Sequence, residues 1–410
     1  FFVDRATYDE AMAAAALFVR GLHEALRHPA AGVARELEAR PRRRALLADA
    51  LAKGAHLGGR VDMLLTASGP KVLEYNAVTP DRLAGGVEFS DPLCAKFAES
   101  PAMRDFSRAH PNHFVTLYDR LFDSFVSKHA RRGGAGAPSV AEVFVPARAD
   151  GAARAEPEAL DDQMVELFGY LYGRGIGIQM CGLADLRYEN GALSANGSTI
   201  DVVFLAGDPE YLDVCPDDDP LWRAVRDGAV ATACGYPLGN LLFEKSLLAD
   251  LTDPAVTRDF DPALAEGLAR VVPWTRRLGD AKTTFRGAPI DLVAFARERR
   301  EELVLKPSAE LGGNGVVLGW EVTPEAWAER LAAAPAGYVV QERVRGRTVE
   351  MPYVEGGAVA RAEFFFDFNP YIWSDGSAAG AITRISRSGV LNVGQGTGSI
   401  APVFVLDPAP

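Results

Sequence analysis

The chain has 410 residues, of which 48% are hydrophobic and 24% are charged, and its formal net charge at pH 7 is −12. This composition is typical of a globular protein and excludes a collagen-like, disordered or disulfide-scaffold protein. At roughly 100–200 residues per domain, the length predicts two or three domains. The acidic balance argues against general binding to nucleic acid or to anionic membranes, because both require a basic face.

Cysteine usage and hydropathy indicate the cellular environment. The cysteines are too widely spread for a zinc site or a redox pair, and we expect buried, reduced thiols. They are Cys94, Cys181, Cys215 and Cys234. No uninterrupted apolar run reaches the roughly 18 residues of a membrane-spanning helix. We therefore expect a cytoplasmic protein.

The first third of the chain predicts helices and then a hairpin. Residues 5–55 are rich in Ala, Leu, Arg and Glu, and their apolar residues recur at helical spacing. Two strands are expected at 60–65 and 71–76, separated by the turn Ser68-Gly69-Pro70. Strands and helices then alternate between about 90 and 240, which predicts a small domain built on a parallel sheet. Its expected elements are strands at 140–145, 176–180 and 200–205 and a helix at 161–173.

The remaining sequence predicts a second α/β region. Residues 240–300 look helical, with a loop near 275–289. Strands at 303–305, 316–318 and 338–340 are expected around a helix at 324–333 that Thr323 caps. The last 60 residues mix strands with two loops of small residues, 374–380 and 394–399.

The hairpin at 60–76 carries polar side chains on one face. Residues i and i+2 of a strand point to the same side, so Arg60 shares its side with Asp62, and Glu74 shares its side with Asn76. Carboxylate and amide oxygens suit Mg²⁺, especially when phosphate oxygens complete the octahedron. A solvated hairpin face with a salt bridge explains the same pattern without a ligand.

A glycine-rich segment follows the expected strand at 303–305. The sequence LVLKPSAELGGNGVV over 303–317 reads as a strand, a lysine, a glycine turn and a second strand. Glycines allow backbone amides to approach a phosphate, and Lys306 supplies positive charge. No helix follows, which excludes a Walker P-loop or a Rossmann turn and favours a flap over nucleotide phosphates. A plain hairpin is the alternative.

Two further segments carry weaker signals. In 338–344 an apolar strand runs into polar residues that can offer backbone groups to an adenine and a carboxylate to a ribose. In 380–386, Arg384 lies on an expected strand beside a Gly/Ser/Thr loop, where it can stabilise a developing oxyanion. A strand end and an exposed arginine are the alternatives.

Taken together, these segments resemble the circularly permuted branch of the ATP-grasp superfamily. LVLKPSAELGGNG resembles its glycine-rich hairpin, and RVDMLL…KVLEYNAVTP resembles the magnesium-binding strands of D-alanine–D-alanine ligases. In those ligases the metal strands follow the glycine hairpin, whereas here they precede it by about 230 residues. This order is similar to eukaryotic-type glutathione synthetases and to the synthetase module of glutathionylspermidine synthases. The chain end AITRISRSGVLNVGQGTGSIAPVFVLDP also resembles the terminal strand and loop of that branch.

The resemblance implies an α/β (α+β) ATP-grasp fold in four parts. Residues 1–90 would hold the metal-binding strands of the permuted core, and 91–240 a parallel α/β substrate domain that precedes the ATP-grasp region in the family. Residues 241–345 would form the lid with its glycine-rich loop, and 346–410 the rest of the core, packed on 1–90.

The resemblance also implies site residues. The implied metal ligands are Glu74, Asn76, Glu310 and Asp62. The implied ATP-binding residues are Lys245, Lys306, Gly312, Gly313, Asn314, Gly315, Gln341, Glu342, Val344 and Glu350. Arg60, Arg384 and Lys306 are the implied catalytic residues. The two arginines would hold a substrate carboxylate or acyl phosphate, and Lys306 would contact the α- and β-phosphates. Ser386 departs from the pattern, because glutathione synthetases carry lysine there.

The function that the resemblance implies is an ATP-dependent carboxylate–amine ligase that uses ATP and Mg²⁺. A substrate carboxylate takes the γ-phosphoryl group, and an amine attacks the acyl phosphate to give an amide. The expected partners are small-molecule carboxylate and amine substrates, with no nucleic acid or membrane, and a homodimer stays open. Substrate contacts are expected within 100–240, with Arg174, Arg187 and Asp201 as candidates. The alternatives are a kinase with a stable phosphorylated product and an ATP-binding protein without turnover.

Overall fold

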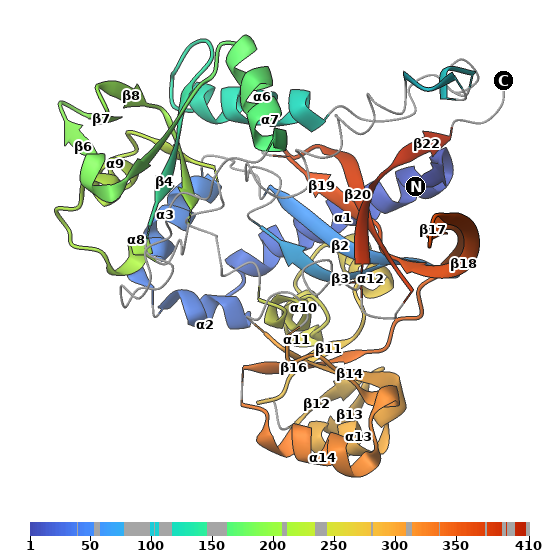
Figure 1. The fold of residues 1–410 in the computed structure, drawn as a ribbon. Helices are drawn as coiled ribbons and strands as arrows, with labels where there is room; N and C mark the ends of the chain where they lie inside the picture. The colour runs from blue at the N-terminus through green and yellow to red at the C-terminus, as the bar shows by residue number, and fades with distance from the viewer. Residues whose placement is uncertain are drawn as a thin grey trace.

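The computed structural model describes residues 1–38, 40–52, 58–77, 99–101, 103–105, 117–145, 162–206, 211–233, 244–279, 282–308, 314–335, 337–373, 375–387, 391 and 398–406. Within these residues the chain is a mixed α/β protein with a central sheet, a parallel-sheet region and a second antiparallel-sheet region (Figure 1). Of the predicted domain boundaries, 90 and 240 lie outside the described residues, and 345 falls between two strands of different sheets.

The central seven-stranded sheet is assembled from both ends of the sequence. Its order is β17–β18–β20–β19–β2–β3, and β21 pairs with β20. The predicted hairpin is confirmed as β2 (Gly59–Thr66) and β3 (Gly69–Asn76), which pair antiparallel. The other strands are β17 (Thr348–Glu355), β18 (Ala358–Phe366), β19 (Asn369–Ile372), β20 (Ala378–Ser386) and β21 (Gly398–Pro402). The terminal strands β1 (Phe2–Asp4) and β22 (Phe404–Leu406) also pair, in parallel.

The loops predicted at 374–380 and 394–399 are shorter than expected within the described residues. Strand β20 already begins at Ala378, and β21 begins at Gly398. Small residues indicated a loop at both places, but pairing between β20 and its neighbours extends the strands into them. Residues 392–397 lie outside the described residues.

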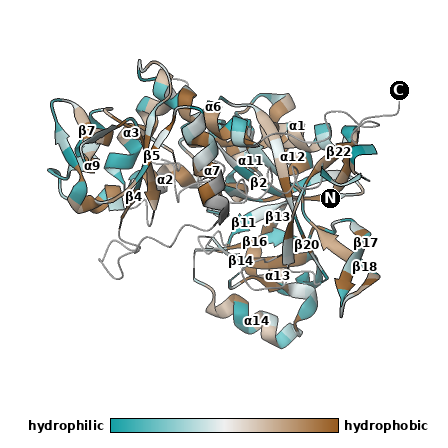
Figure 2. Cartoon of the chain, turned by 45° about the horizontal axis from the view of Figure 1, so that its top comes forward, coloured by the Kyte–Doolittle hydropathy of each residue, from teal (hydrophilic) through white to brown (hydrophobic). Residues whose placement is uncertain are grey.

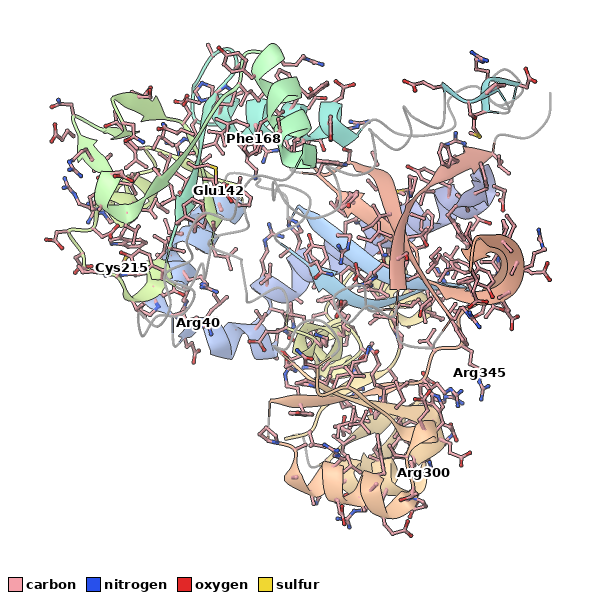
Figure 3. The ribbon with its side chains drawn as sticks, viewed as in Figure 1. Arg40, Glu142, Phe168, Cys215, Arg300 and Arg345 are labelled. Atoms are coloured by element: carbon pink, nitrogen blue, oxygen red, sulfur yellow. The ribbon has the colours of Figure 1, made fainter. Side chains whose placement is uncertain are left out.

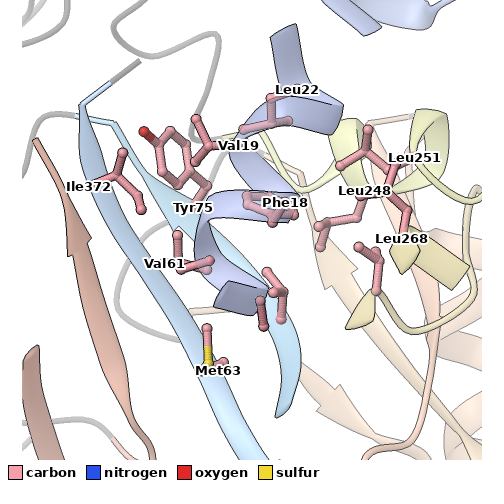
Figure 4. Close-up of a cluster of buried hydrophobic side chains, with 14 of the residues drawn as sticks. Phe18, Val19, Leu22, Val61, Met63, Tyr75, Leu248, Leu251, Leu268 and Ile372 are labelled. Carbon is pink, nitrogen blue, oxygen red and sulfur yellow. The ribbon is translucent and has the colours of Figure 1, made fainter. Parts of the chain in front are cut away.

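Helix α1 (Arg5–Arg27) packs the N-terminus against this sheet. The Asp4 carboxylate accepts a hydrogen bond from Thr7 N at 2.9 Å and caps the helix. Apolar residues at helical spacing, including Phe18 and Leu22, bury one face against side chains of β2 and β3, as Figure 4 shows. The hydroxyl of Tyr8 accepts a hydrogen bond from Gly380 N at 3.0 Å, so the helix is also tied to β20. Neither α1 nor any other helix in the described ranges is long and apolar enough to cross a membrane.

Other helices cover the same core. Predicted helices in 5–55 are confirmed by α1, α2 (Gly32–Glu38) and α3 (Pro41–Ala52). The region predicted as helical after 240 contains α10 (Ser246–Asp250), α11 (Pro254–Thr257), α12 (Pro262–Val271) and α13 (Leu292–Glu298). Leu248, Leu251 and Leu268 from this region meet α1 in the core (Figure 4).

The predicted parallel-sheet region is confirmed. Its strands are β4 (Ser139–Phe144), β5 (Gly177–Gly182), β9 (Val202–Ala206) and β10 (Ala231–Thr232), in the order β10–β9–β4–β5, and all pairs are parallel. The accompanying helices are α6 (Leu117–Ala130), α7 (Asp162–Gly173), α8 (Tyr211–Val214) and α9 (Pro220–Arg226). A small antiparallel sheet adds β6 (Arg187–Glu189), β7 (Ala192–Ala195) and β8 (Ser198–Ile200).

The thiol prediction holds where the structure describes it. Cys181 and Cys215 are buried and form no disulfide. Burial raises the pKa of each thiol to about 11, so both are protonated at neutral pH. Cys94 and Cys234 lie outside the described residues.

A second antiparallel sheet lies within residues 275–342. Its strands are β11 (Thr275–Arg277), β14 (Leu303–Pro307), β15 (Val317–Leu318) and β16 (Tyr338–Glu342), in the order β11–β16–β14–β15. The helix predicted at 324–333 is confirmed as α14 (Pro324–Ala333), and the Thr323 hydroxyl accepts from Ala326 N at its start. Figure 2 shows α14 in both hydrophobic and hydrophilic colours, as its half-buried position requires.

The prediction of a loop near 275–289 is wrong. This stretch holds β11 and a hairpin of β12 (Lys282–Phe285) and β13 (Ala288–Asp291). The strands are short and polar, so they lack the alternation that marks a strand in a sequence. Tertiary contacts stabilise these strands. The buried Arg276 donates to the Thr283 hydroxyl at 2.7 Å, and Trp274 packs edge-on against Phe285.

Asp250 links three elements of the core. Its side chain is 2% exposed and accepts from Gly32 N at 2.9 Å, at the start of α2. It also accepts two hydrogen bonds from Arg277 of β11, at 2.8 and 2.9 Å. Removing one partner from a buried ion pair leaves the other charge uncompensated.

We therefore expect Asp250→Asn to lower the free energy of unfolding by about 3–5 kcal/mol, measured by urea unfolding. Glu266→Gln is the control, because Glu266 pairs with Arg270 on the surface, and it should change stability by less than about 0.5 kcal/mol. Equal effects of the two substitutions would contradict this role of Asp250.

Candidate functional site

A cavity of about 250 Å³ lies between the central sheet and the second antiparallel sheet of β11, β14, β15 and β16. It collects residues from four distant parts of the chain. Of the predicted site residues it is lined by Asp62, Glu74, Lys245, Lys306, Gln341, Glu342, Val344 and Arg384. Its other lining residues are Met63, Leu64, Leu73, Val304, Val316, Leu318, Trp320, Asp367 and Leu391.

A buried chain of alternating charges borders this cavity, and its members Asp62, Arg384 and Asp367 line it. Arg60 donates to both carboxylate oxygens of Asp62, at 2.6 and 3.0 Å. Arg384 donates to Asp62 Oδ2 at 2.8 Å, although the two residues are 322 positions apart. Burial alone would raise the pKa of Asp62, but the two guanidinium charges outweigh it and lower that pKa to about 2. Asp62 is thus ionised at any working pH.

Asp367, which the sequence analysis missed, continues this chain of charges. It is 2% exposed and accepts from Arg384 Nε at 2.6 Å and from Arg384 N at 2.7 Å. Asn369 Nδ2 donates to the same carboxylate at 2.6 Å. Burial raises the pKa of Asp367, and the charge of Arg384 opposes that rise. The acid and amide two residues apart repeat the spacing of Glu74 and Asn76, and this signal would have found the pair.

Two lysines face the opposite side of the cavity. Lys245 Nζ lies 3.4 Å from Glu74 Oε2 and is 6% exposed. Lys306 Nζ donates to Gln341 Oε1 at 2.6 Å. Burial lowers the pKa of Lys306 to about 8; the Glu74 charge opposes this change and the Lys245 charge adds to it. The lysines therefore form a cationic wall whose charge responds to a nearby anion.

Strand β14 fixes both lysines. Lys306 lies on the strand itself, and the strand continues into Ser308, whose carbonyl accepts from Lys245 N at 3.0 Å. The Ser308 hydroxyl accepts from Ser246 N at 3.0 Å and donates to Glu244 Oε2 at 3.0 Å. The start of α10 is thereby attached to the end of β14, which brings two lysines 61 positions apart into one wall.

Apolar side chains from the second antiparallel sheet and the segment after it line another part of the cavity. Val304 lies two residues before Lys306 on β14, and Leu318 lies on the adjacent β15. Trp320 follows, and the Arg343 guanidinium stacks on its ring at 3.8 Å. An apolar surface beside the polar groups of Gln341 and Glu342 suits a planar heterocycle, and the lysines suit phosphates attached to it.

The structure describes three of the four predicted metal ligands, Asp62, Glu74 and Asn76. Asp62 and Glu74 are cross-strand partners in the hairpin, and Asn76 lies two residues beyond Glu74. Asn76 Nδ2 is buried without a hydrogen-bond partner among the described residues. Hard oxygen donors of this kind fit Mg²⁺, although the described residues hold no cluster of three or more His, Cys, Asp or Glu. Glu310, the third predicted carboxylate on the metal, lies outside them.

Other predicted residues are not in the cavity. Glu350 accepts from Arg361 at 2.6 Å in an exposed pair on β17 and β18. Gly315 has a φ of 70° and Asn314 is exposed, whereas Gly312 and Gly313 lie outside the described residues.

The substrate candidates lie in the parallel-sheet region and do not line the cavity. Arg174 donates to Asp119 at 2.7 Å on an exposed surface. Arg187 donates to Ala184 O at 2.8 Å, and Asp201 accepts from Ser139 N at 2.8 Å. These contacts are local to the parallel-sheet region.

Comparisons with known proteins address the fold. No model of a known protein family matches this sequence, and no curated protein does either. Among solved structures, a glutathione synthetase-like effector from Globodera pallida aligns over 98% of this chain and 88% of its own, at 12% identity and a TM-score of 0.52. This chain has a glutathione synthetase-like fold. The predicted resemblance to ATP-grasp proteins is therefore confirmed at the level of the fold.

Two further solved structures align less closely. A putative gamma-glutamylcysteine synthetase from Methylobacillus flagellatus aligns over 93% of this chain and 86% of its own, at 13% identity and a TM-score of 0.42. D-alanyl-alanine synthetase A from Vibrio cholerae aligns over 62% of this chain and 68% of its own, at 12% identity and a TM-score of 0.27. At these TM-scores neither adds to the argument.

The depressed pKa of Lys306 predicts a pH dependence of stability. Between about pH 8 and its ordinary value of 10.5, Lys306 is protonated in the unfolded chain but largely neutral in the folded one. The unfolded state then binds more protons, so stability rises with pH in this window. Relative to Lys306→Met, the wild type should gain up to about 3 kcal/mol from pH 8 to 10.5 in chemical unfolding. Lys282→Met, at an exposed position, should show no such trend; an equal trend would contradict the buried lysine.

Proposed function

We propose that this chain is an ATP-dependent carboxylate–amine ligase with a circularly permuted ATP-grasp arrangement. One observation carries the proposal: a single cavity gathers Glu74, Lys245, Lys306 and Arg384 from four separate segments. Those are the positions that the sequence resemblance implies for metal, phosphates and acyl phosphate. A structural hairpin or an exposed arginine would not need to meet the others.

The strand order supports the permuted arrangement. The hairpin β2–β3 precedes the lid in the sequence, and β19 and β20 follow it, yet all four strands lie in one sheet. β19 pairs antiparallel with β2 and thereby joins the two segments. We propose that residues 241–345 act as the lid over this sheet, with the glycine-rich segment as its flap.

We propose one orientation for a nucleotide in this cavity. The adenine would lie against Val304, Leu318 and Trp320, with the polar edge of the base toward 341–344 and the ribose near Glu342. The phosphates would then extend toward Lys306 and Lys245. Because the Lys306 pKa is lowered to about 8 by burial, an arriving polyphosphate would stabilise its charged form. Mg²⁺ would be held by Glu74 and Asn76, together with Glu310, and would neutralise phosphate charge.

The arginine wall supports phosphoryl transfer to a carboxylate. Burial lowers the pKa of Arg384, but the charges of Asp62 and Asp367 outweigh burial and raise it, so this guanidinium stays charged. A substrate carboxylate oxygen would attack the γ-phosphorus, and ADP would leave. A neutral amine would then attack the acyl carbon, phosphate would leave, and the amine would lose its proton to solvent. Positioning and charge stabilisation supply the rate enhancement, and no side-chain nucleophile is required.

The substrates that we propose are small amino-acid or peptide-like carboxylates and amines. The proposal rests on the fold resemblance and on the modest cavity volume of about 250 Å³. Ser386, buried at the end of β20, replaces the lysine of glutathione synthetases. We therefore propose an acid and amine pair other than that of glutathione synthesis.

Glu74→Gln and Lys306→Ala should each reduce amine-dependent ADP release by more than about a hundredfold, because they remove charge that acts on the transferring phosphoryl group. The assay is a coupled ADP-release screen of acid and amine pairs, with mass spectrometry of the product. A ligase product has lost one water relative to acid plus amine, whereas a kinase product has gained a phosphate. Full turnover by both variants would contradict the proposal.

Two predicted ATP-binding glutamates lie at different places in the structure, and comparing them tests where the nucleotide binds. Glu342 lines the cavity, whereas Glu350 is paired with Arg361 outside it. Glu342→Gln should raise the KM for ATP about three- to tenfold with little change in kcat, because it removes one ribose contact. Glu350→Gln should leave both constants within about twofold. The reverse pattern would show that the nucleotide lies elsewhere.

A further inference from the structure

A second, larger cavity is lined in part by residues 342–345, in the segment that joins β16 to β17. This groove has a volume of about 900 Å³, and among the described residues it shares only Glu342 and Val344 with the first cavity. Its walls are the tip of the β2–β3 hairpin, the region from α10 to β11 and the turn between β12 and β13. A volume of this size lies within the range of small-molecule sites.

The charge of the groove is opposite to that of the whole chain. Lys71, Arg286, Arg343 and Arg345 line it, and Glu342 is its one carboxylate among the described residues. The chain as a whole carries a net charge of −12. Concentrating basic side chains in one concavity of an acidic protein creates a local field that attracts anions.

Two of these arginines, Arg343 and Arg345, lie close enough for their charges to interact. Arg345 is exposed and has no partner among the described residues, and Figure 3 shows its side chain projecting beside the joining segment. Burial and the neighbouring Arg345 charge both lower the pKa of Arg343. Arg343 is held in place by Trp320 and by the carbonyl of Glu301, at 3.3 Å. An anion between these guanidiniums would relieve their repulsion.

Arg286 has an unusual backbone conformation for its residue type. Three tight turns in the described chain place a non-glycine residue at a φ of 51° before a glycine, and two of them use asparagine, Asn190 and Asn196. The third uses Arg286, which precedes Gly287. Asparagine is favoured at this position, and arginine is not. The turn therefore presents a long cation to the groove at a conformational cost, although asparagine would make the better turn.

The floor of the groove is apolar. Leu251, Val272, Pro273 and Trp274 line it. Arginine binds phosphate and carboxylate through paired N–H groups, and an apolar floor accommodates the carbon body to which such groups are attached.

We infer that this groove is a second binding site, for a small molecule that carries phosphate or carboxylate groups. The inference does not depend on the proposed ligase activity. Glu342 connects the two cavities: it lines both and pairs with Arg286 at 3.1 Å. An anion that engages Arg286 therefore competes with Glu342 for it and changes the wall of the first cavity.

The test is calorimetric titration of the full chain with inorganic pyrophosphate at constant ionic strength. The wild type should bind pyrophosphate saturably, and the double variant Arg286→Asn, Arg345→Ser should bind at least about tenfold more weakly. Asparagine fits the turn, so thermal unfolding of this variant should begin no earlier than that of the wild type.

Two controls locate the site. Arg330→Ser removes an exposed arginine from α14, and Lys306→Ala alters the first cavity; both should retain the groove affinity. The inference is overturned by the absence of saturable binding to the wild type, by unchanged affinity in the double variant, or by an equal loss in Arg330→Ser. Loss of binding in Lys306→Ala alone would assign the pyrophosphate to the first cavity and also overturn the inference.

Discussion

The buried series Arg60–Asp62–Arg384–Asp367 connects the beginning and the end of the chain. Each buried charge carries a desolvation penalty of several kcal/mol, which is offset only when every partner is in place. Asp62 on β2 meets Arg384 on β20, and β19 lies between those strands in the sheet. The register of the central sheet is thus linked to an electrostatic requirement, because a strand shift of one residue would turn these side chains to the other face.

The same series shapes the cavity. Arg384 is held by two carboxylates, so its position and charge do not depend on a substrate. On the opposite side, the lysines are less fully compensated: Lys245 faces Glu74 at 3.4 Å, and Lys306 has a neutral partner in Gln341. One wall is therefore preorganised and the other responds to an incoming anion. That asymmetry is what phosphoryl transfer between a bound polyphosphate and a carboxylate requires.

Much of this arrangement could be predicted from local sequence. The hairpin at 59–76 follows from apolar alternation around a turn, and Thr323 marks the start of α14 in the usual manner of an N-cap. The parallel sheet follows from the alternation of strands and helices. The joint occurrence of a lysine-bearing glycine hairpin and polar hairpin strands indicated that distant segments would share a site.

What the sequence could not predict depends on tertiary contacts. The strands at 275–291 are too short and polar to be recognised, because they are stabilised by the buried Arg276 and by an aromatic cluster around Trp274. Asp367 lies in a run of aromatic residues that reads as an ordinary core strand. Glu350 follows the cavity residue Val344 closely in the sequence. Strand pairing nevertheless places Glu350 opposite Glu363, and its side chain pairs with Arg361. No local pattern encodes the pairing of Glu350, whereas the spacing of Asp367 and Asn369 is a local signal for that pair.

We propose that four separate segments of the chain form one nucleotide site. A crystal structure of the chain with Mg²⁺ and a non-hydrolysable ATP analogue tests it most directly. We expect the adenine against Val304, Leu318 and Trp320 with its polar edge toward residues 341–344, and the phosphates within hydrogen-bond distance of Lys245 and Lys306. A nucleotide bound elsewhere, or one whose phosphates contact neither lysine, would contradict it.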